Sequence, residues 1–86
     1  MGMPGTLKER IAIRDLTEMV DPILLRYRVT AEEVEGERRL PHLVAARRVI
    51  AKALHEELGW STAAIGEFLK RDAGTIWSYL NPRDRR

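Results

Sequence analysis

Two short apolar patterns near the end of the chain, at residues 61–69 and 72–80, constrain its fold more than any other feature. They read STAAIGEFL and DAGTIWSYL, and only Lys70 and Arg71 separate them. Each would form a helix of about eight residues, which is too short to be stable alone in water. In both patterns apolar residues recur four positions apart and so lie on one helix face. We therefore expect the two helices to persist only by burying these faces against each other.

The connection between the two patterns predicts how they pack. Gly66 has no side chain, which lets the second helix cross the first closely. Lys70, Arg71 and Asp72 form a three-residue turn, in which Asp72 is placed to cap the second helix and to compensate its dipole. Two helices joined by so short a turn form a helix-turn-helix, whose second helix can enter the major groove of DNA. Glycine early in a helix costs about 1 kcal/mol relative to alanine, so Gly74 suits a surface where a larger side chain would collide with a partner.

The first part of the chain is also predicted to be helical. Residues 7–20 carry apolar side chains at helical spacing and indicate one amphipathic helix. Asp21 and Pro22 then have the pattern of an N-cap followed by proline at the first helical position, which predicts a second short helix over residues 22–28. This second helix either stands apart from the first or continues it at an angle, since proline also kinks helices.

Stronger start and stop signals bound the helices that follow. Thr30 and Glu33 have the spacing of a capping box, and Gly36 is a natural stop for the short helix between them. The longest predicted helix spans residues 41–58, from a proline at its first position to Gly59 directly after its end. The apolar face of this helix is predicted to consist of Leu43, Ala46, Ile50, Leu54 and Leu58.

The composition is that of one small domain. The chain has 86 residues, of which 44% are hydrophobic and 33% are charged, so we expect it to be globular with one modest core. It has no cysteine, which excludes a disulfide framework and fits a reducing compartment such as the cytoplasm. No apolar run approaches the roughly 20 residues of a membrane span. We predict an all-α domain of five or six helices over residues 7–81, containing a helix-turn-helix at 61–80, with a disordered start at 1–6 and a basic tail at 82–86.

Charge is distributed unevenly along the chain. Residues 38–86 carry ten of the fifteen Lys and Arg side chains and five of the thirteen Asp and Glu side chains, a net charge of +5. Residues 1–37 carry a net charge of −3, and the whole chain carries +2. Such an asymmetry indicates that the second half faces a polyanion. Ordinary solvated helix faces produce the same pattern, so charge alone does not decide between the two interpretations.

The order of several sequence blocks resembles that of a known family. The chain reads YRVTAEEVEGERR, then ARRVIAKALHEEL, then STAAIG and finally RDAGTI. This order, over residues 16–80, is similar to the C-terminal DNA-binding domain of DnaA, the bacterial chromosomal replication initiator. The resemblance implies a stand-alone relative that binds double-stranded DNA at the nucleoid. It also implies a role in the control of replication or transcription in a bacterium, a phage or a mobile element.

The resemblance implies which residues contact DNA. Arg38 or Arg39, in the basic loop, would enter the minor groove, and Arg48 would contact the sugar-phosphate backbone of the DNA. Residues 71–72 match the Arg-Asp of the family signature, whereas the base-reading His-Thr-Thr is replaced here by Ala-Gly-Thr at 73–75. Small residues there allow close approach to base edges, and the threonine offers a hydroxyl and a methyl group. The predicted DNA-binding residues are Arg38, Arg39, Arg48, Lys70, Arg71, Asp72, Ala73, Gly74, Thr75 and Ser78.

Two other functions remain open. The lost His-Thr-Thr and the acidic first half favour a protein-interaction module that keeps the fold and engages a replication or transcription protein. A dimeric repressor with the 7–20 helix as its seam is the third possibility, so we expect a monomer or a weak homodimer. Catalysis has no support, because His42 and His55 lack the spacing of a helical zinc site and the chain has no cysteine nucleophile or glycine-rich phosphate loop. We therefore expect no enzymatic activity, no metal and no cofactor.

Several single residues keep two interpretations. Arg48, Lys52 and His55 form a basic stripe on the longest helix, which is either a solvated face or a phosphate contact. Trp60 is predicted to pack in the core at the start of the next helix. Trp77 is either half buried or placed at the groove-facing edge of the last helix, where it would stack on a sugar or on a partner.

Overall fold

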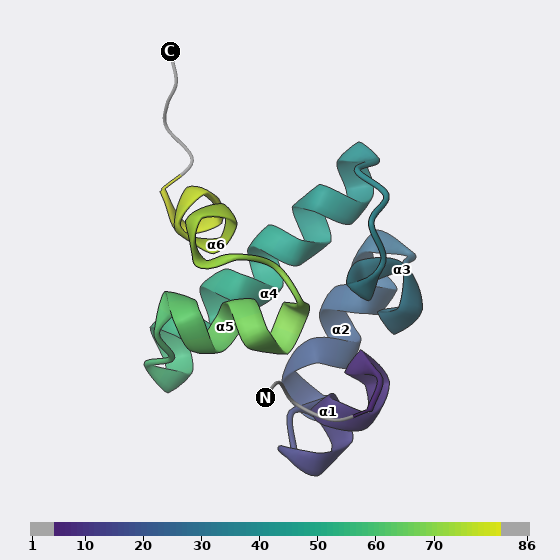
Figure 1. The fold of residues 1–86 in the computed structure, drawn as a ribbon. Coiled ribbons are helices and arrows are strands. Elements are labelled where there is room, and N and C mark those ends of the chain that lie inside the picture. Colours follow the sequence, from purple (N-terminus) through teal and green to yellow (C-terminus); the bar gives the residue numbers. More distant parts are fainter. Residues whose placement is uncertain (1–4, 82–86) are drawn as a thin grey trace.

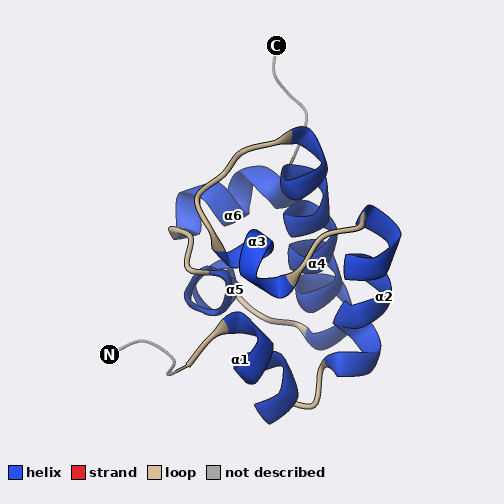
Figure 2. Ribbon diagram, turned by 90° about the vertical axis from the view of Figure 1, so that its right-hand side faces the viewer, coloured by secondary structure: helices blue, strands red, loops and turns tan. Residues whose placement is uncertain are grey.

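The computed structural model describes residues 5–81, and the helices in this range confirm the all-α prediction. They are α1 (Leu7–Ile13), α2 (Thr17–Tyr27), α3 (Ala31–Glu35), α4 (Pro41–Leu58), α5 (Thr62–Leu69) and α6 (Ala73–Leu80). Figure 1 shows α4 running through the centre, with α5 and α6 on one side and α1, α2 and α3 on the other. α4 contacts α2, α3, α5 and α6, and Figure 2 shows this arrangement from the side. No helix of residues 5–81 has both the length and the apolar character needed to cross a bilayer.

The core forms along α4, because apolar residues repeat there every three or four positions. Four members of the predicted apolar face are at most 1% exposed: Leu43, Ala46, Ile50 and Leu54. The prediction is wrong for Leu58, which is 44% exposed. The helix ends at this residue, and Gly59 turns the chain away in the left-handed conformation with φ 72°. One contiguous cluster of buried side chains includes residues from all six described helices, so they form one domain.

The helix ends from residue 30 onward lie where the sequence predicts them. The Thr30 hydroxyl accepts a hydrogen bond from the Glu33 N–H at 3.1 Å, and the Glu33 carboxylate accepts one from the Thr30 N–H at 2.9 Å. Pro41 is the first residue of α4. Ser61 caps α5 by accepting a hydrogen bond from the Ala64 N–H at 3.1 Å. Caps of this kind each stabilise a helix by about 1 kcal/mol, which matters most for helices this short.

The prediction of one helix over residues 7–20 is wrong. The chain breaks at residues 14–16, where Asp15 adopts a left-handed conformation with φ 58°. The Leu16 N–H donates to the Ile11 carbonyl at 2.8 Å, a bond typical of a helix end. The short side chain of aspartate tolerates this conformation better than most residues do. The break lets Leu16 turn into the core, where it is 7% exposed.

The predicted start of a second helix at Asp21 and Pro22 is also wrong. α2 begins at Thr17, so Pro22 lies inside it. Proline at this position removes the N–H that would donate to the carbonyl of Glu18. Both Glu18 and Pro22 are exposed, so water can satisfy that carbonyl and the helix continues.

An N-cap that the sequence prediction overlooked starts α1. The Thr6 hydroxyl accepts from the Glu9 N–H at 3.2 Å, and the Glu9 carboxylate accepts from the Thr6 N–H at 2.9 Å. This is a capping box of the same kind as the one at Thr30. The predicted disordered start at 1–6 is therefore too long, while residues 1–4 and the tail at 82–86 lie outside the described residues.

α5 and α6 lie against each other, and the turn between them depends on Gly66. Lys70 ends α5 in the left-handed conformation with φ 59°. The Arg71 N–H then donates to the Gly66 carbonyl at 2.8 Å. A Cβ atom on Gly66 would lie 2.5 Å from the Arg71 carbonyl oxygen and 3.6 Å from the Ala73 nitrogen, so the glycine is needed for the close approach of the turn rather than of the crossing helix. Trp60 packs edge-on against Phe68, with 5.3 Å between the ring centroids.

Candidate nucleic-acid interface

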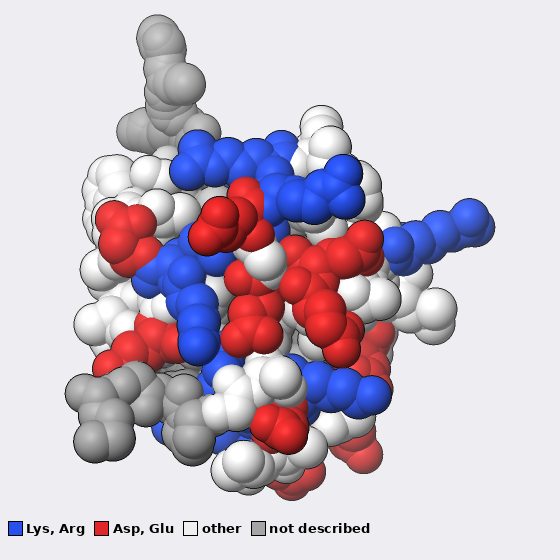
Figure 3. Space-filling view, turned by 45° about the vertical axis from the view of Figure 1, so that its right-hand side comes forward, with Lys and Arg blue, Asp and Glu red and all other residues white. Residues whose placement is uncertain are grey.

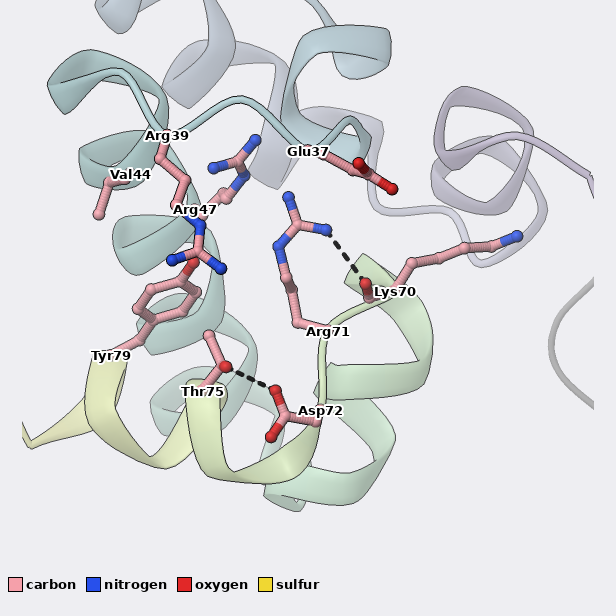
Figure 4. A pocket seen from close by; sticks show the side chains of 9 residues that line it. All are labelled: Glu37, Arg39, Val44, Arg47, Lys70, Arg71, Asp72, Thr75 and Tyr79. Atoms are coloured by element: carbon pink, nitrogen blue, oxygen red, sulfur yellow. Dashed lines mark hydrogen bonds between the residues drawn. The ribbon is translucent and has the colours of Figure 1, made fainter.

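A hollow of about 670 Å³ lies beside the first turns of α6. We call it the α6 hollow. Figure 4 shows that it is bounded by the loop between α3 and α4, by α4, by the turn between α5 and α6, and by α6 itself. Five of the ten predicted DNA-binding residues line it, namely Arg39, Lys70, Arg71, Asp72 and Thr75. Four more lining residues were not predicted, namely Glu37, Val44, Arg47 and Tyr79.

The other five predicted residues do not line the α6 hollow. Ala73, Gly74 and Ser78 are exposed on the outer side of α6. Arg38 is exposed in the loop between α3 and α4, and Arg48 is exposed on α4. The structure therefore divides the predicted residues into those that line the hollow, an adjacent uncharged surface on α6, and two exposed arginines apart from both.

Arg47 is buried although it is charged. It is 1% exposed, and its Nε donates to the Val34 carbonyl at 2.8 Å. Its Nη2 donates to the carbonyls of Glu33 at 3.1 Å and Gly36 at 3.0 Å. Carbonyls at the end of a helix have no partner within the helix, so Arg47 closes the carboxyl end of α3. A signal for this role exists in the sequence, because Arg47 lies four positions after Leu43 and so falls on the buried face of α4.

Arg71 reaches the same end of α3 from the opposite side. Its Nη1 donates to the Lys70 carbonyl at 3.0 Å and makes a longer contact of 3.5 Å with the Glu35 carbonyl. Its Nη2 donates to the Gly36 carbonyl and lies 3.5 Å from the Val34 carbonyl. Most of the donors of Arg71, which the sequence analysis assigned to DNA, are therefore engaged within the protein.

A second buried arginine ties α1 to α3 and α5. Arg10 is 2% exposed, pairs with Glu35 at 2.8 Å and donates to the Phe68 carbonyl at 2.9 Å. Glu35 also accepts a hydrogen bond from the Leu7 N–H at 3.0 Å. Burial alone would favour the neutral form of Glu35, but the hydrogen bonds from Leu7 and Arg10 and the charge of Arg10 hold its pKa below the ordinary value. This ion pair stabilises the fold and lies outside the α6 hollow.

Asp72 occupies the N-cap position of α6, but its side chain does not cap the backbone. Its carboxylate accepts a hydrogen bond from the Thr75 hydroxyl at 2.5 Å instead. This hydrogen bond lowers the pKa of the Asp72 carboxyl. The predicted position of Asp72 is thus confirmed, while the predicted capping bond is wrong, and the hydroxyl proton of Thr75 is engaged by Asp72.

The outer side of α6 also presents an aromatic ring. Trp77 is 60% exposed, which decides against its predicted half-buried alternative. The face beside α6 carries both signs of charge, since Figure 3 shows basic and acidic side chains next to one another. Among the residues of this face that line the hollow, Glu37 and Asp72 are acidic. The candidate interface is therefore positive only locally.

Within residues 5–81, no group of three or more His, Cys, Asp or Glu residues is placed to hold a metal ion.

Comparison with known proteins adds no information about this site. No known protein family, no curated protein and no solved structure matches the chain. The similarity to the DnaA domain thus stays a prediction from the order of the sequence blocks.

Proposed function

We propose that the chain is a small DNA-binding domain in which α5 and α6 act as a helix-turn-helix and α6 enters the major groove. The observation that carries this proposal is the uncharged, exposed front of α6, which consists of Ala73, Gly74 and Ser78. A Cβ atom on Gly74 would approach only the Asp72 carboxylate, at 3.2 Å, so nothing else in the described protein requires a glycine there. Ala73 and Ser78 are equally small and exposed. Such a surface can approach base edges closely.

Exposed cationic side chains on α4 and at the end of α5 are available for phosphate contacts. Lys70 is exposed, and Figure 4 shows its side chain extending away from the arginines of the α6 hollow. Arg48 and Lys52 are exposed on α4. Phosphate contacts of this kind position a protein on a duplex without reading its sequence. The order of the sequence blocks adds the proposal that the process is replication or transcription control.

Fluorescence anisotropy with labelled duplexes at several salt concentrations tests this function. Lys70→Ala should weaken binding to every duplex by a similar factor and should reduce the slope of log K against log salt by about 1. Lys8→Ala makes the same change of charge at an exposed position of α1, a helix remote from α6, and serves as the matched control. Ser78→Ala should instead change which sequences are preferred. Absence of salt-dependent binding to any duplex at low salt would refute the proposal.

A second candidate function is a protein-interaction module for a replication or transcription protein. The exposed ring of Trp77 favours it, because tryptophan often anchors protein interfaces. Affinity capture with and without nuclease separates the two functions. A partner that persists after nuclease treatment and is lost with Trp77→Ala supports the module, whereas a partner lost with the nucleic acid supports DNA binding.

A further inference from the structure

The α6 hollow gathers three guanidinium groups from three parts of the chain. Arg39 comes from the loop between α3 and α4, Arg47 from α4 and Arg71 from the turn before α6, and Figure 4 shows all three extending into the same space. No carboxylate of residues 5–81 forms an ion pair with any of them, since the single salt bridge in that range joins Arg10 and Glu35. Like charges that line the same hollow repel one another, and an anion between them would reduce this repulsion.

Donor groups of these arginines remain open. Arg47 is 1% exposed, and besides its hydrogen bonds to the carbonyls at the end of α3 it interacts with the side chain of Tyr79, so the open donors belong to the other two arginines. The Nε of Arg71 is without a described acceptor, because the hydrogen bonds of this side chain all start from Nη1 and Nη2. Arg39 is exposed and makes no hydrogen bond within the described residues. Arg71 is only half-buried and Arg39 is exposed, so both can offer their open donors to a ligand that enters the hollow and supplies the acceptor.

The electrostatics of Arg47 agree with this geometry. Burial and the neighbouring charge of Arg71 lower the pKa of Arg47, Tyr79 acts in the opposite direction, and Arg39 adds a further lowering effect. An anion in the α6 hollow would remove part of this repulsion. Glu37 and Asp72 also line the hollow, so the arginine side of the space is the side where an anion is favoured.

We propose that the α6 hollow binds a phosphate group between Arg39, Arg47 and Arg71. The planar guanidinium group matches phosphate oxygens and forms short, charge-assisted hydrogen bonds with them. The volume of about 670 Å³ lies within the range of small-molecule sites, so a phosphate with an organic group attached also fits. The phosphate comes either from a free phosphorylated molecule or from the backbone of a duplex. The second source rests on the proposed DNA-binding function, and the first does not.

Pyrophosphate is the probe for the first source. It is titrated into the protein at constant ionic strength, and binding is followed by calorimetry and by the NMR signal of the Arg71 Nε–H. We expect saturable binding that shifts this signal and that Arg39→Gln weakens by about ten-fold, as loss of charge-assisted hydrogen bonds predicts. Arg26→Gln is the matched control, because Arg26 is exposed on α2 and does not line the hollow. Because Arg39 is exposed, its replacement should leave the fold intact.

Labelled duplex DNA is the probe for the second source. Competition between pyrophosphate and duplex, together with weaker duplex binding by Arg39→Gln than by Arg26→Gln, assigns the hollow to the DNA backbone. Simultaneous binding of both assigns it to a free phosphorylated molecule. Pyrophosphate binding that depends on Arg39, with no duplex binding, refutes the proposed DNA function and supports the phosphate site. Equal effects of the two arginine variants, or no saturable binding of either probe, overturn the site.

Discussion

Gly66→Ala tests the close contact on which the arrangement of α5 and α6 depends. The added Cβ would lie 2.5 Å from the carbonyl oxygen of Arg71, and ordinary contact begins near 3.4 Å, so the turn must move by about 0.9 Å. The colliding atom belongs to the backbone and cannot rotate away. The movement also disturbs the hydrogen bond of 2.8 Å from the Arg71 N–H to the Gly66 carbonyl.

Two opposing effects set the size of the change. Alanine favours a helix interior over glycine by about 1 kcal/mol. Inserting a methyl group into a closely packed site costs about 1–3 kcal/mol, and the weakened hydrogen bond costs about 1 kcal/mol more. We expect the free energy of unfolding to fall by about 2 kcal/mol, which corresponds to a melting temperature lower by roughly 8–16 °C for a domain of this size.

Urea denaturation followed by circular dichroism measures this change. Gly74→Ala is the matched control, because this glycine also lies inside a short helix but is exposed and faces only the Asp72 side chain, at 3.2 Å. It should stabilise the protein by about 0.5–1 kcal/mol through helix propensity alone. If Gly66→Ala is as stable as the parent or follows Gly74→Ala upward, the argument from close contact is wrong.

Three further predictions follow from the buried charges and the exposed ring. Arg47→Ala should lower the free energy of unfolding by about 3 kcal/mol, because the last carbonyls of α3 lose their donors, while Arg48→Ala on the exposed face should change it by less than about 0.5 kcal/mol in the same urea experiment. The pKa of Glu35 is lowered on folding, so the stability that it contributes is present above its ordinary pKa of 4.5 and is lost as the pH falls through the folded value. Glu35→Gln should therefore flatten the fall in melting temperature with acid pH, and an unchanged slope would contradict this assignment. Trp77→Ala should leave stability within about 0.5 kcal/mol yet weaken partner binding, which thermal melting and a binding assay check together.

The helices from α3 onward could be predicted from the sequence because each carries its own end signals. Thr30 and Ser61 cap helices with side-chain oxygens, proline opens α4 and Gly59 closes it in a left-handed conformation that other residues adopt at a cost. These are short-range effects that depend on a few neighbouring residues. They do not depend on tertiary packing, so the sequence alone predicts these helix ends.

The break between α1 and α2 could not be predicted in the same way. Asp15 takes a conformation that usually indicates glycine, and the gain that offsets its cost is the burial of Leu16 in a core formed by distant helices. Asp21 and Pro22 carried the stronger local signal and were misleading, because exposed proline is tolerated inside α2. Tertiary packing decided this boundary against local preference.

Five of the predicted DNA-binding residues meet at the α6 hollow, but the roles of its arginines within the protein were not predicted. Arg71 was predicted to bind DNA and Arg47 was not predicted at all, yet both donate to the carbonyls at the end of α3. A sequence shows that a residue is cationic, but it does not show which buried acceptors its donors will meet. Only the register of Arg47 with Leu43 on α4 indicated burial.

The hydrogen bonds that Arg47 and Arg71 make within the protein limit how much of the positive charge of residues 38–86 is available for phosphate contacts. Arg47 and Arg71 contribute to this charge, but most of their donors hold the end of α3 against α4 and the turn before α6. Phosphate contacts on an exposed surface therefore depend on residues such as Arg39 and Lys70, whose side chains are exposed. The salt dependence of duplex binding should be that of a few phosphate contacts. Arg71→Ala should lower the free energy of unfolding even at salt concentrations that abolish duplex binding, because Arg71 donates to carbonyl groups of the protein itself.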